Sequence, residues 1–311
     1  MRRWLPALAL LLPSSALAIP RLYTPDDVAG ARSVGMGDAF RGIGTNNDAI
    51  VENPATLVLN PHYEITGFFA WDTAAPGAFW NASIVDATTL PLALGLSYTH
   101  VGAGTGSPSA QASDPLDFGR YVGATARLAL AYPLSDALSV GINAEWLNYA
   151  GDLAQDGTFA QISAITGSAA IAVHPTPQLT LTGIGYNLVP IGLGSALAPR
   201  RFALGGSYGS DTTFRVDVDG IGTWTSFPVP QTTGLDLHVG GEIFVAGTVA
   251  IRAGYFYSGV TETNFGSVGL GLVVPGFAID VGYRQSLGNT WNGQSWSDHL
   301  FIADLKFFLP G

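Results

Sequence analysis

The sequence predicts an all-β protein: a transmembrane antiparallel β-barrel of about 14 strands with an N-terminal plug in its lumen. Of its 311 residues 47% are hydrophobic and only 12% are charged, which is too apolar for an ordinary soluble surface. The chain nevertheless has no unbroken apolar run of the roughly 18 or more residues that a membrane helix needs. From His62 onward it alternates apolar and polar residues in short segments separated by Gly, Pro, Asn, Asp and Ser. This alternation is typical of the strands of a membrane barrel.

The order of segments along the chain predicts an exported protein. Residues 1–18 have the features of a signal peptide, with Arg2 and Arg3, an apolar stretch over 5–12, and Ala16-Leu17-Ala18 as the cleavage site. The apolar stretch is too short to span a bilayer. Residues 19–61 do not alternate and are expected to form the plug, or hatch. Residues 62–311 are expected to form the barrel in the outer membrane of a Gram-negative bacterium.

The alternating segments give the expected strands. Short connections follow every second strand, whereas longer polar connections at 104–119, 188–199, 224–233 and 287–296 follow several of the others. Membrane barrels have short turns on the periplasmic side and longer loops outside, so this asymmetry predicts which end is which. The expected strands are 62–71, 77–87, 91–103, 120–133, 137–150, 158–174, 177–187, 200–209, 212–223, 234–246, 248–258, 264–274, 276–286 and 297–309.

The alternation also predicts which side chains face lipid and which face the lumen. In the segment 212–223, Val216 and Val218 share one face and Asp217 lies on the other. A charge at the lipid face costs roughly 2 to 4 kcal/mol at the bilayer midplane, so the charged face must point inward. We interpret the inward residues as an ion-paired lumen, with steering of a substrate or holding of the plug as the alternative. The lumen residues predicted in this way are Arg127, Glu145, Arg215, Asp217, Asp236, His238, Glu242, Arg252, Asp280 and Arg284.

Composition and spacing argue against several other functions. Cysteine is absent, which excludes disulfides and Cys-ligated metals, and the net charge of −10 argues against a nucleic-acid partner. His238 and Glu242 lie four residues apart on one strand, roughly 13 Å, which is too far for one metal ion. We therefore expect no metal and no cofactor. We also expect no enzymatic activity, because the best local cluster, His299 near Ser297 and Asp298, matches no nucleophile motif.

Most tryptophans fall near the ends of the expected strands. An amphipathic ring prefers the membrane interface, so these residues are expected to form an aromatic girdle. A base-stacking platform would instead need basic surroundings, which are missing. The girdle residues expected are Trp71, Trp80, Trp146, Trp224, Trp291 and Trp296.

The segment before the barrel contains the densest motif in the chain. Glycines permit tight turns and close contact with the wall of a narrow lumen, and Asn53-Pro54 suits a turn from plug to wall. We interpret the motif as packing the plug, with direct contact to a ligand as the alternative. Its residues are Gly35, Gly37, Ala39 and Phe40, followed by Asp48 and then by Asn53, Pro54 and Ala55.

This motif resembles the N-terminal plug of the FadL family of outer-membrane transporters, and is still more similar in pattern to the related PorV/PorQ-type proteins. The resemblance implies a 14-stranded, plugged barrel. It also implies passive uptake of hydrophobic small molecules, such as fatty acids or hydrocarbons, with outer-membrane lipid as the surroundings. FadL-type members release their ligand sideways through a gap at a kinked strand. The alternative is a PorV-like scaffold that binds a partner protein in secretion or surface assembly.

Overall fold

The computed structural model describes residues 28–45, 47–73, 77–103, 121–152, 159–189, 200–225, 232–259, 262–288, 290–291, 294–295 and 297–309. The expected signal peptide and most of the expected long loops lie outside these residues. The helical elements are α1 (Ala31–Gly35), α2 (Asn47–Glu52) and the 3-10 turn η2 (Pro54–Thr56). The strands are β1 (Tyr63–Asp72), β2 (Gly77–Asp86), β3 (Ala93–Ala103), β4 (Tyr121–Ser135), β5 (Leu138–Asp152), β6 (Phe159–Thr176), β7 (Leu179–Tyr186), β8 (Arg200–Gly209), β9 (Phe214–Thr225), β10 (Thr232–Val245), β11 (Val249–Ser258), β12 (Thr263–Val274), β13 (Phe277–Ser286), β14 (Thr290–Trp291), β15 (Gln294–Ser295) and β16 (His299–Leu309).

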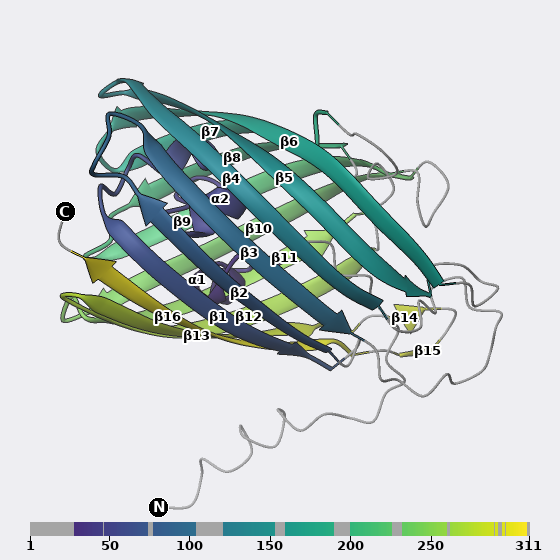
Figure 1. Ribbon diagram of the computed structural model, residues 1–311. Helices are drawn as coiled ribbons and strands as arrows, with labels where there is room; N and C mark the ends of the chain where they lie inside the picture. The colour runs from purple at the N-terminus through teal and green to yellow at the C-terminus, as the bar shows by residue number, and fades with distance from the viewer. Residues whose placement is uncertain are drawn as a thin grey trace, which may run out of the picture.

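Fourteen of these strands form one closed antiparallel barrel, as the sequence predicts (Figure 1). The strands β1 to β13 pair in chain order, β13 pairs with β16, and β1 closes the sheet on β16 from Tyr63↔Leu309 to Asp72↔Leu300. The short turns and both ends of the wall lie at one end of the barrel, which we call the turn end. The opposite end is called the loop end. By the asymmetry of membrane barrels, we expect the turn end to face the periplasm.

The strands differ from the expected ones in detail. The hairpin β14–β15 was not predicted, and it lies within the polar connection expected at 287–296. Strands β4 and β6 run past their expected ends, and their pairing shifts register between Pro133 and Ser135 and between Val173 and Thr176. Pro133 and Pro175 lie at these shifts. Proline has no N–H to donate to the ladder, so regular pairing cannot continue through it.

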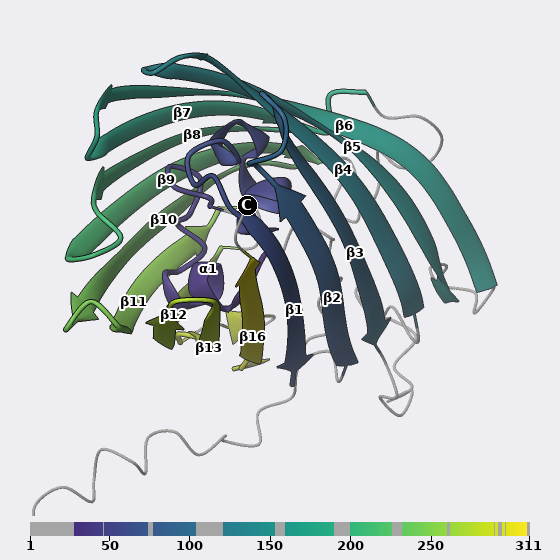
Figure 2. The ribbon, with the colours of Figure 1, turned by 60° about the vertical axis from the view of Figure 1, so that its left-hand side comes forward.

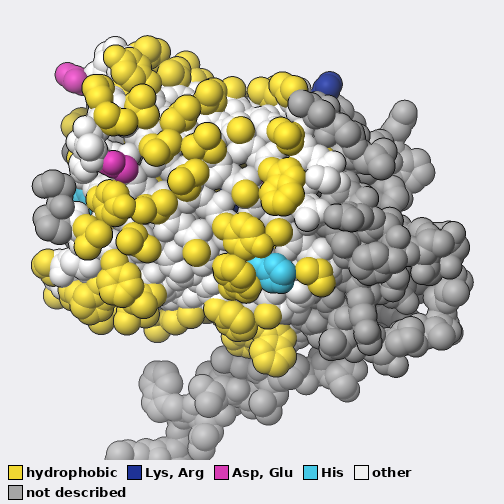
Figure 3. Space-filling view, in the orientation of Figure 1, with side chains coloured by type: hydrophobic (Ala, Val, Ile, Leu, Met, Phe, Trp, Pro, Cys, Tyr) yellow, Lys and Arg dark blue, Asp and Glu magenta, His cyan; other side chains and the backbone are white. Residues whose placement is uncertain are grey.

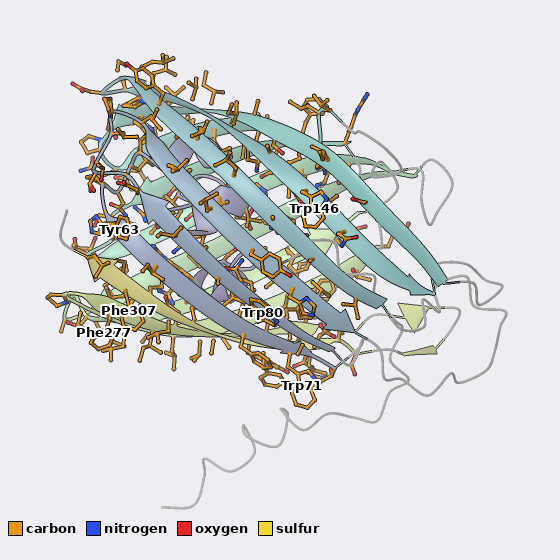
Figure 4. The ribbon with its side chains drawn as sticks, in the orientation of Figure 1. Tyr63, Trp71, Trp80, Trp146, Phe277 and Phe307 are labelled. Carbon is orange, nitrogen blue, oxygen red and sulfur yellow. The ribbon has the colours of Figure 1, made fainter. Side chains whose placement is uncertain are left out.

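Apolar side chains are spread over the outer face of the barrel that Figure 3 shows, with few charged groups among them. Leu204 on β8 is 74% exposed, and Val216, Val218 and Leu270 are each about half exposed, whereas Asp217 between the two valines is buried. Trp71, Trp80 and Trp146 project outward toward the loop end, and Tyr63, Phe277 and Phe307 lie toward the turn end (Figure 4). The side chains of Trp224, Trp291 and Trp296 lie outside those that the structure describes. The apolar band between aromatic ends is the surface that lipid requires.

The described part of the N-terminal segment, from Val28 to Asn60, lies inside the barrel, where it is drawn in purple in Figure 2. We call these residues the plug. Helix α1 contacts β11, β12, β13 and β16, α2 contacts β1 to β4, and η2 contacts β4 to β6. The plug therefore touches the wall on most sides. Within the described residues, no helix has the length and apolar character that crossing a bilayer requires.

Candidate passage through the barrel lumen

The glycine motif of the plug forms a tight turn against the wall. Gly37 and Asp38 both have positive φ, 68° and 56°, after α1 ends. A side chain on Gly37 would place its Cβ 2.6 Å from the backbone nitrogen of Tyr255, and one on Gly35 would lie 3.0 Å from the Cα of Gly269. Ala39 and Phe40 follow, fully buried. Glycine is therefore required here both by backbone conformation and by space.

The Asn-Pro-Ala part of the motif connects the plug to the wall. The amide oxygen of Asn53 accepts the N–H of Ala55 at 3.1 Å, and its Nδ2 donates to the carbonyl of Arg41 at 2.7 Å. The carbonyl of Ala55 accepts the hydroxyl of Ser139 on β5 at 2.7 Å. Pro54 and Ala55 pack on Gly141, where a Cβ would come within 2.4 Å of the plug backbone. In this structure these contacts position the plug.

Arg41 links the plug to itself and to β9. Its guanidinium lies 2.9 Å from Oε2 of Glu52 and 3.5 Å from Oδ2 of Asp219, and Asp219 also accepts the N–H groups of Phe40 and Arg41. Burial raises the pKa of Glu52 to about 7, although the charge of Arg41 opposes this shift. Sequence analysis did not select Arg41. The sequence feature that could have identified Arg41 was its position directly after the motif residue Phe40. A cation inside a narrow lumen needs an acidic partner.

A second set of ion pairs crosses the turn end of the lumen. Arg32 on α1 binds Glu242 at 2.5 Å and Asp211 at 2.8 Å, and Arg252 binds Glu242 at 2.6 Å and Asp280 at 2.7 Å. Burial alone would raise the pKa of Asp211, but the charges of Arg32 and Arg215 outweigh burial and hold the pKa below its ordinary value. Plug and wall are thus joined by alternating charges.

Lys306 on β16 extends these ion pairs. Its Nζ lies 3.2 Å from Oδ2 of Asp48 on α2, and 3.9 Å from carboxylate oxygens of Asp280 and Asp304. Asp304 in turn accepts the N–H of Ala31 at 2.7 Å. The motif residue Asp48 therefore anchors α2 to the last strand.

A cavity of about 500 Å³ opens among these charged groups at the turn end. Its charged lining includes Arg32, Arg252 and Lys306, and its apolar lining includes Phe244 and Phe308. The cavity lies between the plug and strands β10 to β13 and β16. Each of the three cations is paired with a carboxylate, so the lining is polar without carrying unbalanced positive charge.

The plug turn is also held from β10 and β13. The Nδ1 of His238 lies 2.9 Å from the carbonyl oxygen of Gly37, and Arg284 donates to Oδ2 of Asp38 at 3.0 Å. The ring of His238 stacks on Phe256, and Phe256 stacks on Phe265 at 4.3 Å between centroids. The guanidinium of Arg284 lies over both phenylalanine rings. A cation over aromatic faces is a favourable arrangement in a dry site.

A cluster of apolar side chains lies on the inward face of part of the wall, toward the loop end. We call them the loop-end cluster, and sequence alternation did not select them because inward positions were expected to be polar. The sequence feature that could have identified them is two apolar residues in succession within a strand, as at Phe68-Phe69 in β1. The cluster brings together Val28, Ala31 and Val34 of the plug with Phe68, Ala70, Phe79, Val101, Leu147, Ala164, Leu300 and Ile302 of the wall.

The remaining predicted lumen residues are also on inward positions. Arg127 and Glu145 pair at 3.0 Å between β4 and β5, Arg215 binds Asp211, and Asp217 is fully buried on β9. Asp236 is partly buried and accepts the N–H of Gly259. His238 and Glu242 belong to separate clusters, and in the described ranges no group of three or more His, Asp or Glu residues is arranged to hold a metal.

In the structure, His299 and Asp298 have different hydrogen-bond partners. The Nδ1 of His299 lies 2.7 Å from the hydroxyl of Tyr283, and Asp298 donates its N–H to Ser286. Asp298 lies just before β16, which begins at His299, and both residues are buried.

The fold and the lumen together define a plugged, 14-stranded transmembrane β-barrel. Solved structures with this fold include the CymD monoaromatic hydrocarbon channel (TM-score 0.68, 13% identity, 92% of this chain and 98% of that chain). They also include the toluene transporter TodX of Pseudomonas putida (TM-score 0.64, 14% identity, 94% of this chain and 99% of that chain). A third is a FadL homologue of Pseudomonas aeruginosa (TM-score 0.66, 13% identity, 94% of this chain and 99% of that chain). The chain therefore has the FadL-type fold. No protein-family model and no curated protein matches the sequence.

Proposed function

We propose that the protein is an outer-membrane channel for the passive uptake of hydrophobic small molecules past its N-terminal plug, and that it is not an enzyme. The observation that carries this proposal is the loop-end cluster, because apolar side chains packed inside the barrel suit a hydrophobic solute better than water or ions. Two proteins with the same fold are described as a toluene transporter and a monoaromatic hydrocarbon channel. The apolar outer face suits outer-membrane lipid as the surroundings.

The proposed path begins at the loop end and meets the plug. A solute would bind among side chains such as Phe79 and Leu147, and it would advance when the plug residues around 35–53 shift. Export through a removable signal peptide over residues 1–18 and a plug over 19–61 belong to the same proposal. Of the lumen residues predicted from alternation, His238, Glu242 and Arg284 would act by holding the plug, because each contacts a plug residue directly.

Uptake of radiolabelled toluene by intact Gram-negative cells tests the proposal. Cells that produce the protein should take up toluene faster than cells without it. Phe79→Asp should lower the initial rate at least tenfold, because a buried charge makes the loop-end cluster unfavourable for an apolar solute. Leu90→Asp in the exposed β2–β3 turn is the matched control and should keep the rate.

Two outcomes contradict the proposal. One is an equal rate in cells with and without the protein. The other is a properly inserted Phe79→Asp variant that transports as well as the unchanged protein. Co-purification of one periplasmic or surface protein in stoichiometric amount, without any toluene uptake, would instead favour the partner-binding scaffold.

A further inference from the structure

On the inward face of β2 and β3, polar side chains lie midway along the strands, and the polar side chains of β1 lie beside them, toward the turn end. In β2 the inward residues run, from the loop end to the turn end, through Phe79, then Asn81 and Ser83, then Val85. Strand β3 repeats the order, with apolar Val101 and Ala93 at the two ends. We call these residues the polar band: Glu64, Thr66, Asn81, Ser83, Ser97 and Thr99, all of them buried.

The polar band separates two apolar clusters that both include plug residues. The loop-end cluster lies on one side of it. On the other side, toward the turn end, Val85, Ala93, Ala129 and Ala131 of the wall pack with Ala49, Ile50 and Leu57 of the plug. A hydrophobic solute that moved along β1 to β3 from one cluster to the other would have to cross the polar band.

The contacts between plug and wall favour this side of the lumen for passage. Over β10 to β12 the plug backbone lies directly on glycines, and a Cβ on Gly240 would come within 2.1 Å of the carbonyl oxygen of Met36. Such contacts open only if a backbone moves. Along β1 to β3 the contacts are made by side chains, as where Ile50 packs over Gly95. Side chains can change rotamer without any movement of the backbone.

Part of the polar band is satisfied internally. The Nδ2 of Asn81 donates to the hydroxyls of Ser97 and Thr99 at 2.8 and 2.9 Å. The Nδ2 group of Asn81 therefore needs no further hydrogen-bond acceptor.

The corner around Glu64 is different. Asn47 of the plug donates through Nδ2 to Oε1 of Glu64 at 2.7 Å and to the hydroxyl of Thr66, which itself donates to the same Oε1 at 2.7 Å. These bonds fix the amide orientation and leave Oδ1 of Asn47 as an acceptor. Among the residues that the structure describes, Oδ1 of Asn47, Oε2 of Glu64 and Oγ of Ser83 have no hydrogen-bond partner. Ser83 is the register partner of Thr66.

Buried polar atoms without partners destabilise a fold, so their presence needs an explanation. We propose that Asn47, Glu64 and Ser83 form a binding site for the hydroxyl group of a hydrophobic solute, such as a phenol or an alcohol, whose apolar body lies against the two clusters. The solute hydroxyl donates to an acceptor of Asn47 or Glu64, and its oxygen accepts from Ser83. This inference rests on the proposed function and adds a preference for hydroxylated solutes over plain hydrocarbons.

Binding of a ring-matched pair, phenol and benzene, to the detergent-solubilised full chain tests the preference by titration calorimetry. The unchanged protein should bind phenol roughly tenfold more tightly than benzene, the equivalent of one hydrogen bond to a buried acceptor. Glu64→Gln and Ser83→Ala should each lower the ratio of the two affinities to less than threefold. Ser83→Ala removes an oxygen that makes no hydrogen bond, so it should fold even if Glu64→Gln does not.

Thr223→Val is the matched control, because Thr223 is a buried inward residue of β9 far from the polar band, and its hydroxyl also lacks a partner. It should keep the ratio of the unchanged protein. An unchanged ratio in Ser83→Ala, or equal affinities in the unchanged protein, would overturn the inference while benzene binding still supported the proposed function. If the unchanged protein bound neither solute, the proposed function itself would fail.

Discussion

At the scale of single residues, two glycines with nearly the same backbone conformation have different surroundings. Gly37 in the plug has φ 68° and Gly247 in the β10–β11 turn has φ 66°. A Cβ on Gly37 would lie 2.6 Å from the nitrogen of Tyr255, whereas one on Gly247 would meet nothing within 4 Å. Both substitutions to alanine should cost about 1 kcal/mol for left-handed backbone. Only Gly37→Ala should add roughly 1 to 3 kcal/mol for the collision with the wall.

Urea titration of the two alanine variants, followed by the mobility of unboiled samples on gels, measures the difference. Gly37→Ala should unfold at a clearly lower urea concentration than Gly247→Ala. Equal losses would mean that the plug turn can move away from β11, contrary to the contact described here.

For the charged residues, the position in the sequence predicted which side chains face the lumen but not which side chains they pair with. The inward placement of Asp217 or Arg252 followed from alternation with apolar neighbours. Their partners did not, because Arg252 binds Glu242 from the adjacent strand while Arg284 binds Asp38 of the plug, 246 residues away. Arg41 lies in a segment without alternation, so no periodicity indicated its contact with Asp219.

At the scale of elements, the sidedness of the strands makes a sharp prediction. Leu204 is 74% exposed near the middle of β8 and faces the lipid. Leu204→Arg should destabilise the inserted barrel by roughly 2 to 4 kcal/mol, because the charge would enter the hydrocarbon. Thr212→Arg in the exposed β8–β9 turn should have an effect near zero. Urea unfolding in lipid vesicles measures both variants, and equal stability of the two would contradict the lipid-facing assignment.

The strands were predictable because lipid on one side and lumen on the other impose a period of two. The same rule fails where that contrast is missing. The hairpin β14–β15 has only two residues in each strand, too few for any period. At Phe68 and Phe79 both faces are apolar, so alternation assigned no interior role to these members of the loop-end cluster. The short plug helices also lack the length that a helical period requires.

At the scale of the whole molecule, the plug is held by anchors on opposite sides of the barrel, and the absence of cysteine allows its motion to be measured. Ala39→Cys would place a single, fully buried thiol in the plug. A maleimide reagent should label it slowly. Adding Arg284→Met should speed labelling at least tenfold, because loss of the partner of Asp38 leaves a buried carboxylate uncompensated in the closed position.

Arg127→Met provides the control for this experiment. It breaks a buried ion pair of similar length, 3.0 Å, that joins β4 to β5. Labelling of Ala39→Cys should stay slow in this background. If both substitutions speed labelling equally, the effect reflects general loosening of the barrel, and Asp38–Arg284 has no special part in holding the plug.

The sequence by itself determined the strand count, the direction of each strand face and the presence of a non-alternating segment before the barrel. Each of these follows from local rules: strand period, turn residues and the cost of charge in lipid. Only the tertiary structure decided which wall glycines receive the plug backbone, which acid pairs with which base, and that apolar clusters lie on both sides of a polar band. Those features depend on residues far apart in the chain meeting inside a closed sheet, and no local period encodes such meetings.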